Sequence, residues 1–249
     1  WKSRIISPKV ELFNKFIKKD KHLSDPDELD YRNHDPKVLN DIQDVGTCSG
    51  SDWAFAVAAC IETNHALSFH KTLYKISEQC LIDCVEYCDG CNSCEAYAAF
   101  TFSTGIYEGY TNLIQDYPWT GSKGTCNFNQ EKSVALYTGV YWGHENPEAD
   151  MIHWLNTVGI GAVRIDASSA SFQLYTSGVY DDKNCGTKTN LDVDVVGYGN
   201  EGTGDSAVPY WICRNSWGTA WGESGYFRIL RGVNQCGITT VFGFPAVFA

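Results

Sequence analysis

Eleven cysteines in 249 residues constrain this chain more than any other feature of its sequence. Cytosolic proteins keep their thiols reduced, so this content favours disulfides formed in an oxidising place, either outside the cell or in a lysosomal or vacuolar lumen. Cys91-Asn-Ser-Cys94 has the spacing of a zinc knuckle, but the sequence offers no second pair of ligands to complete it. We therefore expect a disulfide framework, no metal and no other cofactor. Because the count is odd, at least one thiol stays free or pairs with another chain.

The charge is divided between a basic N-terminus and an acidic remainder. Residues 1–23 hold seven Lys and Arg against two acidic side chains, whereas the rest of the chain holds 12 basic against 28 acidic side chains. A basic arm on an acidic body is expected to lie against that body, so nucleic acid is not an expected partner. Residues 10–17 place apolar side chains at helical spacing and predict a short amphipathic helix. No apolar run is long enough to predict a membrane span.

The pattern of apolar residues changes near residues 117–118. Before this point, runs at helical spacing predict helices that start at Asp52, span 75–86 with Ser77 as N-cap, and span 96–102. After it, alternation of β-branched residues predicts strands, with one helix at 149–157; the strands are 134–141, 161–166, 193–198, 210–214 and 226–230. We therefore predict an α+β fold with a mainly helical lobe over about 45–130 and a β-rich lobe over about 131–249. Two such lobes are expected to face each other across a cleft.

Three segments carry a resemblance to the papain-like cysteine proteases, of the cathepsin L type. They are C-S-G-S-D-W-A-F at 48–55, I-S-E-Q-C-L-I-D-C at 76–84 and Y-W-I-C-R-N-S-W-G-T-A-W-G-E-S-G-Y-F-R-I at 210–229. The third is the most specific, since few other families combine N-S-W-G with a following W-G-x-x-G-Y. The resemblance covers residues 24–249 and implies a two-lobe fold in which a helical lobe and a barrel-like β lobe enclose a cleft.

Most of the residues that such a protease needs for catalysis are replaced. The family uses a cysteine thiolate at a helix N-terminus, a histidine that moves the proton, an asparagine that orients the histidine, and a glutamine that binds the oxyanion. The resemblance places Asp52 at the cysteine position, Leu191 at the histidine position and Val45 at the glutamine position. Asn215 alone is retained. We therefore expect an inactive member of the family, a pseudoprotease rather than an enzyme.

An atypical hydrolase that uses Ser51 with Asp52 is the alternative that keeps an activity. A serine depends on a base even more than a cysteine does, because its hydroxyl is less acidic. A carboxylate at a helix N-terminus is expected to be held as the anion, which makes it a poor base. The simpler expectation is that Ser51 or Asp52 caps the helix.

The resemblance also indicates an altered substrate groove. Arg164 and Asp192 stand where the family has small or apolar walls of its specificity pocket, and we expect a salt bridge between them to fill that pocket. The alternative is that each side chain points to solvent independently. Ser93 and Cys94 follow Cys91-Asn92 where the family has a glycine pair, and their side chains hinder close approach of a substrate backbone. The remaining residues expected at the groove are Ser51, Trp217 and Val241.

The family's disulfides map onto Cys48–Cys91, Cys84–Cys126 and Cys185–Cys236. Proximity within one loop suggests a fourth, Cys88–Cys94. Cys60 and Cys213 are expected as small buried apolar groups, and Cys80 is left unassigned. Asp194 lies within an apolar run, so its carboxyl is expected to face inward and to need a partner.

The function expected from these features is binding without catalysis. The partner is expected to be a protein: an inhibitor for which this chain is a decoy, an active protease, or a host protein. A structural or storage role is the remaining form of this expectation. A further alternative is glycan or glycoprotein binding across Trp119, Trp142 and Trp154, although such residues more often belong to a core. Residues 1–23 are expected to be a remnant of the family's pro-segment or an extension peculiar to this chain.

Overall fold

The computed structural model describes residues 25–68, 72–100, 109–135, 139–141 and 147–247. The basic segment 1–23 and the helix predicted at 10–17 lie outside these residues, so both stay predictions.

The first lobe is built around one long buried helix. Helix α2 (Asp52–Leu67) buries every residue from Asp52 to Ala66, which explains why the run at 53–61 is apolar on all sides. Helix α3 (Glu78–Cys84) packs against it and begins at Ser77, whose side chain accepts the Cys80 N–H at 2.9 Å. A two-stranded sheet completes this lobe, made of β2 (Tyr110–Asn112) and β3 (Ser133–Ala135).

The second lobe is an eight-stranded sheet. Seven strands follow one another in the order β4 (Gly139–Tyr141), β10 (Phe242–Ala246), β5 (Gly161–Ile165), β7 (Leu191–Glu201), β8 (Val208–Arg214), β9 (Tyr226–Leu230) and β6 (Val179–Tyr180). Strand β1 (Leu29–Asp30) pairs with β7 at a place where a side chain on Gly197 would collide with the Leu29 carbonyl. All pairs are antiparallel except β6 with β9.

Short helices surround the sheet. Helices α5 (Pro147–Thr157) and α6 (Ala170–Gln173) belong to the second lobe. Four 3-10 turns lie at Tyr31–Asn33, Gln130–Lys132, Gly204–Ser206 and Gln235–Gly237. None of the helices in the described part of the chain is both long and apolar enough to cross a bilayer.

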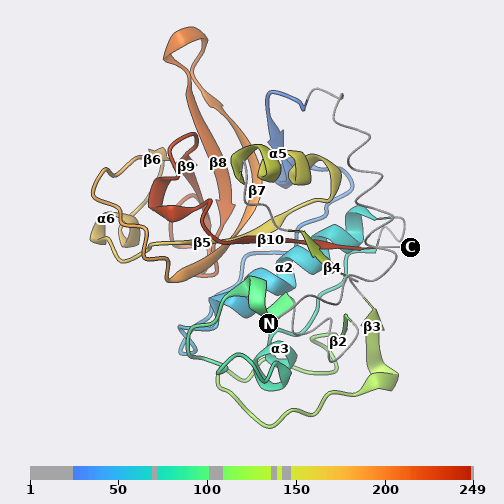
Figure 1. Cartoon of the computed structure of the whole chain (residues 1–249). Helices are drawn as coiled ribbons and strands as arrows, with labels where there is room; N and C mark the ends of the chain where they lie inside the picture. The colour runs from blue at the N-terminus through green and yellow to red at the C-terminus, as the bar shows by residue number, and fades with distance from the viewer. Residues whose placement is uncertain (1–24, 69–71, 101–108, 136–138, 142–146, 248–249) are drawn as a thin grey trace, which may run out of the picture.

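Helix α2 joins the two lobes. It packs on β7, β10 and β5 and lies between the sheet and α3 (Figure 1). The Asn64 amide group donates to the carbonyls of Ile160 and Pro245 at 3.0 and 2.9 Å, and its oxygen accepts the Ile160 N–H. These bonds fix the helix to the β lobe and thereby fix the cleft that opens at its N-terminus.

The α+β two-lobe prediction is confirmed, with differences in detail. The helix predicted at 75–86 spans only Glu78–Cys84, and the run at 134–141 is two strands, β3 and β4, on either side of residues outside the description. Residues 96–100 are helical as far as the description extends. Strand β10 was not predicted, because Gly243 and Pro245 interrupt the alternation by which strands are recognised.

Candidate functional site

A cleft of about 450 Å³ opens where the two lobes meet. Its helical-lobe side comes from the turn that precedes α2 and from the loop around residue 93. Its β-lobe side comes from the segment after β5, the start of β7 and the loop after β8. The lining residues are Ser49, Gly50, Asp52, Ser93, Ala167, Ser168, Gln173, Asn190, Leu191 and Trp217.

The turn before α2 is held tightly against the loop that carries Cys91. A side chain on Gly50 would place its Cβ 2.3 Å from the Cys91 carbonyl oxygen, so this approach requires glycine. The Cys48–Cys91 disulfide and the bond from the Trp53 indole N–H to the Gly90 carbonyl, at 3.0 Å, tie the same segments together. The residue that starts α2 is thereby fixed relative to the cleft.

Ser51 does not belong to the groove, contrary to the sequence-based prediction. Its side chain is fully buried, and its hydroxyl donates to the Cys48 carbonyl at 2.6 Å. Ser51 occupies the N-cap position of α2, yet its side chain makes no capping bond. The Asp52 side chain is not the cap of α2 either, because its Oδ2 accepts the Asp192 N–H from β7.

Asp52 faces the β lobe from the first position of α2. It is only 3 % exposed, and its Oδ2 accepts the Asp192 N–H at 2.6 Å. Burial raises the pKa of Asp52 to about 6, against the opposing effects of this hydrogen bond and of Arg164. The helix N-terminus therefore does not lower the pKa of Asp52 below its ordinary value, since loss of hydration outweighs the helix dipole, and Asp52 is an anion only above about pH 6.

The other two positions at which the resemblance predicts a replaced catalytic residue are buried and apolar. Leu191 opens β7 and forms part of the cleft wall next to Asp52. Val45 is buried beside the cleft without lining it, and its N–H donates to the Ser216 carbonyl at 3.0 Å. The retained Asn215 accepts the Ser216 N–H, whereas its amide nitrogen is buried with no hydrogen-bond partner in the described part of the chain.

That Asn215 nitrogen faces a second, internal cavity of about 10 Å³. Two further buried groups that lack partners, Arg214 Nη1 and Ser216 Oγ, belong to the lining of the same cavity. Asp194 lines it as well. Its Oδ1 accepts the Cys60 thiol at 3.2 Å, which identifies the partner that the sequence could not name.

All eleven cysteines lie among the described residues. Eight form the four disulfides that were predicted, Cys48–Cys91, Cys84–Cys126, Cys88–Cys94 and Cys185–Cys236. Because Cys91 and Cys94 are in disulfides, the zinc alternative is excluded. Burial raises the pKa of the three free thiols, Cys60, Cys80 and Cys213, and none of them lines the cleft.

The predicted salt bridge between Arg164 and Asp192 is present and buried. Arg164 Nη1 lies 2.5 Å from Asp192 Oδ2, and the two side chains are 7 % and 2 % exposed. Arg164 also donates to the Cys94 carbonyl and to Ser93 Oγ, so it connects β5 to the loop that the resemblance placed at the specificity pocket. The Val241 carbonyl accepts the Arg164 N–H at 3.0 Å; Val241 itself is not part of the cleft lining.

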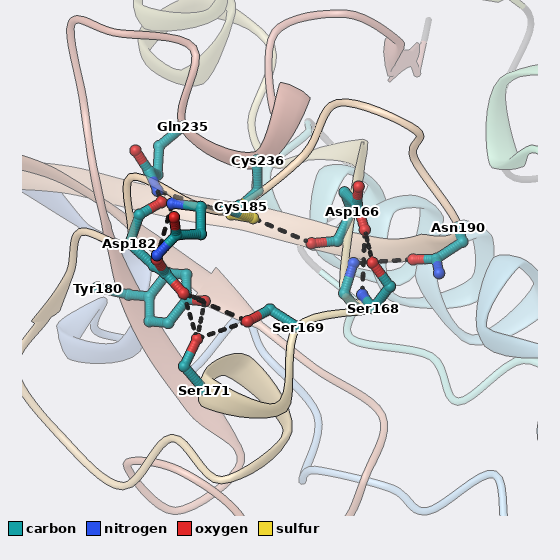
Figure 2. The surroundings of a disulfide bond; sticks show 12 residues. Asp166, Ser168, Ser169, Ser171, Tyr180, Asp182, Cys185, Asn190, Gln235 and Cys236 are labelled. Carbon is teal, nitrogen blue, oxygen red and sulfur yellow. Dashed lines mark hydrogen bonds between the residues drawn. A yellow bond between two sulfur atoms is a disulfide. The ribbon is translucent and has the colours of Figure 1, made fainter.

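The wall formed by Ser168 and Asn190 was not recognised from the sequence. Asp166 Oδ1 accepts both the N–H and the hydroxyl of Ser168, and Asn190 Oδ1 accepts the Ala167 N–H at 2.8 Å. Figure 2 shows this wall beside the Cys185–Cys236 disulfide, where the Cys185 sulfur contacts the Asp166 carbonyl. No residue in 165–173 identifies this wall from sequence alone, because the wall forms only when β7 pairs with β5 and brings Asn190 next to Ala167.

The aromatic residues considered for glycan binding do not form one described surface. Trp154 packs in the core against Tyr141, Phe242 and Phe244. Trp119 packs edge-on against Phe55, and Trp142 lies outside the described residues. The burial of Trp154 removes it from this alternative.

Comparison with known proteins assigns the chain to a family whose two-lobe fold and cleft agree with those described above. Residues 25–246 match the model of the papain family cysteine proteases. The chain belongs to the papain family. It is 39% identical over 233 residues to cathepsin L of Sarcophaga peregrina and 36% identical over 227 residues to procathepsin L of Mus musculus, matches that cover 91% and 89% of this chain. The chain spans 65% and 66% of the lengths of these two relatives.

Solved structures of the papain family superpose on the described fold. A digestive procathepsin L2 proteinase from the larval midgut of Tenebrio molitor gives a TM-score of 0.82 at 32% identity, covering 92% of this chain and 70% of that one. Bromelain from Ananas comosus, solved in complex with the E64 inhibitor, gives 0.77 at 32% identity, covering 90% of this chain and all of its own.

This papain-family cleft therefore presents a carboxyl group, hydroxyls, amides, a leucine and an indole. Three histidines lie among the described residues, His34, His65 and His153, and none is part of the cleft lining. No group of three or more possible metal ligands is present in the part of the chain that the structure describes.

Proposed function

We propose that this papain-family chain does not hydrolyse peptides and acts by binding through the retained cleft. One observation carries the proposal: Asp52 occupies the first turn of α2 at the cleft, while every cysteine is either in a disulfide or buried away from it. The thiolate is the nucleophile of cysteine proteases, and a buried thiol with a raised pKa supplies none.

The absence of a suitable base supports the same proposal. Leu191 lies beside Asp52 on the cleft wall, and its side chain can neither accept nor donate a proton. The alternative of a Ser51 nucleophile gains no support, because the Ser51 hydroxyl is buried and already donates to the Cys48 carbonyl. Asp52 is not placed as a base for Ser51 either, because the Ser51 hydroxyl donates to the Cys48 carbonyl while Asp52 Oδ2 accepts the Asp192 N–H.

The positive role that we propose is recognition of a protein. The cleft keeps a volume of about 450 Å³, so an extended segment of a partner has room there although Arg164 and Asp192 close the specificity pocket. An inhibitor that normally enters the cleft of an active protease is one such partner, and an active protease is another. Four disulfides support a secreted protein or one of a lysosomal or vacuolar lumen.

The decisive experiment restores the missing groups in steps. The protein and the variants Asp52→Cys and Asp52→Cys with Leu191→His are incubated with fluorogenic peptides and with a thiol-directed epoxide probe. We expect neither labelling nor turnover for the natural chain, labelling at residue 52 for the single variant, and turnover at least tenfold higher for the double variant. Asp52→Ala is the matched control and is expected to stay unlabelled.

Turnover by the natural chain would overturn the proposal. If Ser51→Ala then abolished that turnover, the serine mechanism would replace it. The decoy role is tested by titrating the natural chain into an active papain-family protease held inhibited by a limiting protein inhibitor. Recovery of protease activity supports a decoy, and no recovery assigns the binding role to another kind of partner.

A further inference from the structure

The Asp52 carboxylate has one oxygen engaged and one oxygen directed to a cleft. Oδ2 accepts the Asp192 N–H, and no hydrogen bond from another residue reaches Oδ1 in the described part of the chain. Asp52 is 3 % exposed and belongs to the cleft lining, so its carboxylate has lost most of its hydration, while the only protein donors that reach it among the described residues are the Asp192 N–H and its own backbone N–H. A buried polar group left in this state favours any ligand that brings a donor to it.

The charges around Asp52 do not cancel. The charged groups that act on it are Asp192 on β7 and Arg164 on β5, while Glu95 acts on Asp192. Both oxygens of Asp192 accept donors, Oδ1 from the Ala96 N–H and Oδ2 from Arg164, so a proton on either oxygen would face another donor. Burial raises the pKa of Asp192, an effect that Arg164 and the Ala96 N–H oppose, and the ionised form of Asp192 is the one that pairs with Arg164. Once Asp52 ionises, two carboxylates share the single positive charge of Arg164.

The rest of the cleft suits a cation better than an anion. Neither lysine nor arginine is among the lining residues that the structure describes, whereas Ser49 and Ser168 offer hydroxyl oxygens and Asn190 an amide; the Ser93 hydroxyl already accepts from Arg164. The indole of Trp217 supplies an aromatic face, which attracts cations, and Leu191 supplies an apolar contact for a methylene chain.

The geometry distinguishes between two kinds of organic cation. A guanidinium is recognised best by two carboxylate oxygens side by side, and Asp52 has only one oxygen left after bonding the Asp192 N–H. An ammonium group is a compact charge that a single carboxylate oxygen and nearby hydroxyls can satisfy.

We propose that the cleft is a binding site for a protonated primary amine on an aliphatic chain, with Asp52 as its counter-ion. This inference rests on the proposed function, because it takes residue 52 as a binding group in place of a nucleophile. The amine can come from a lysine side chain of a protein or from a free aliphatic diamine, and the two sources share the chemistry that the cleft recognises.

The test measures binding by calorimetry at pH 7.5 with three matched probes. N-acetyl-lysine methylamide is expected to bind, while its neutral isostere, N-acetyl-norleucine methylamide, is expected to bind at least tenfold more weakly. N-acetyl-arginine methylamide is expected to bind more weakly than the lysine probe. Equal or tighter binding of the norleucine probe overturns the proposal, and tighter binding of the arginine probe overturns the choice of an amine.

Variants of the chain test whether Asp52 is the counter-ion. Asp52→Asn keeps an oxygen that can accept the Asp192 N–H, and it should lower the affinity for the lysine probe at least tenfold. Asp205→Asn makes the same charge change on the exposed turn at Gly204–Ser206 and should leave the affinity unchanged. Near-ultraviolet circular dichroism of both variants shows whether the fold is intact. Unchanged affinity in a folded Asp52→Asn protein overturns the proposal.

The pH dependence of binding tests the charge of Asp52, and the binding of a free diamine tests the source of the amine. Affinity for the lysine probe should fall about tenfold at pH 5, one unit below the pKa of Asp52, because the protonated carboxyl no longer attracts the ammonium.

Binding of cadaverine as tight as that of the lysine probe identifies free diamines as ligands, and weaker binding favours a lysine-bearing protein. Peptide hydrolysis is assayed on the same preparation: turnover would overturn the proposed function alone, and absent amine binding would overturn this inference alone.

Discussion

At the scale of single residues, burial decides the properties of the acidic side chains that the sequence singled out. Asp52 stands at a helix N-terminus, a place that favours the anion, yet its pKa is raised to about 6. Asp194 is fully enclosed, and burial raises its pKa to about 7 although Arg214 opposes this. Burial raises the pKa of Asp192 as well, although Arg164 contacts it directly and both of its oxygens accept donors.

Removing one partner of the Arg164–Asp192 pair should be more damaging than removing both charges. We expect Arg164→Met to lower the free energy of unfolding by about 3–5 kcal/mol, because it leaves Asp192 buried and uncompensated. Adding Asp192→Asn should recover part of this loss, since asparagine keeps an oxygen for the Ala96 N–H. Urea unfolding followed by tryptophan fluorescence measures both values.

Lys37→Ala is the matched control for this comparison. It removes an ion pair with Asp41 in which both side chains are largely exposed, and it should leave the urea midpoint unchanged within error. A double variant less stable than Arg164→Met would contradict the role that we assign to the uncompensated charge.

At the scale of elements, the loops around the cleft are held by disulfides rather than by regular structure. Cys48–Cys91 fixes the turn before α2, and Cys88–Cys94 closes the loop whose Cys94 carbonyl and Ser93 hydroxyl receive Arg164. Cys185–Cys236 lies beside the wall formed by Ser168 and Asn190 (Figure 2). The cleft thus keeps its form although much of its lining comes from loops.

The disulfides should differ in their contribution to stability. Replacing Cys88 and Cys94 by alanine opens a loop of separation 6, and replacing Cys84 and Cys126 opens one of separation 42. Loop-closure entropy then predicts losses of about 2 and about 4 kcal/mol. Thermal unfolding of the two double variants checks the order. A larger loss for Cys88–Cys94 would mean that its contacts with Arg164, rather than chain entropy, dominate.

At the scale of the whole molecule, helix α2 and the sheet enclose several ionisable groups between the lobes. The internal cavity is lined by Glu62, Lys75, Glu78, Asp194 and Arg214, among others. Burial raises the pKa values of two of them, Glu78 and Asp194, so the protonation of these two groups is coupled to folding. The pH at which the protein is most stable follows from this coupling.

We expect the free energy of unfolding to fall as the pH rises from about 4 to 7. Asp52 and Asp194 have folded-state pKa values of about 6 and 7, above the ordinary value of 3.8, so each stabilises the fold below pH 4 and loses that effect as it ionises. Asp194→Asn keeps an oxygen for the Cys60 thiol and should flatten the dependence by on the order of 3 kcal/mol. Chemical denaturation across this pH range measures the slope.

Asp205→Asn, on an exposed turn, is the control for that slope and should leave it unchanged. Below about pH 4 the trend should reverse, because Asp166, Asp182 and Glu223 have lowered pKa values and lose their stabilising bonds when protonated. Stability that rises steadily from pH 4 to 7 would contradict the raised pKa values of Asp52 and Asp194.

Much of the fold and part of the candidate site could be predicted from local sequence. Helix α2, its starting residue and strand β9 follow from patterns of apolar residues, because these patterns reflect which face each element buries. The motifs placed Asp52 and Leu191 near each other and identified three of the four disulfides, and proximity within one loop suggested the fourth. They misplaced Ser51, since a difference of one residue in a turn decides whether a hydroxyl faces the cleft or the Cys48 carbonyl.

By itself, the sequence determined the two-lobe fold and the disulfide framework, and it predicted which groups of a papain-family cleft are replaced. Only the tertiary structure decided the surroundings of the residues at those positions. It buried Arg164 against Asp192, enclosed Asp194 with Cys60, and placed Asp52 at the cleft with one oxygen bound to β7. The physical reason is that local patterns encode which residues are buried, whereas the charge of a buried carboxyl depends on donors brought to it from distant parts of the chain.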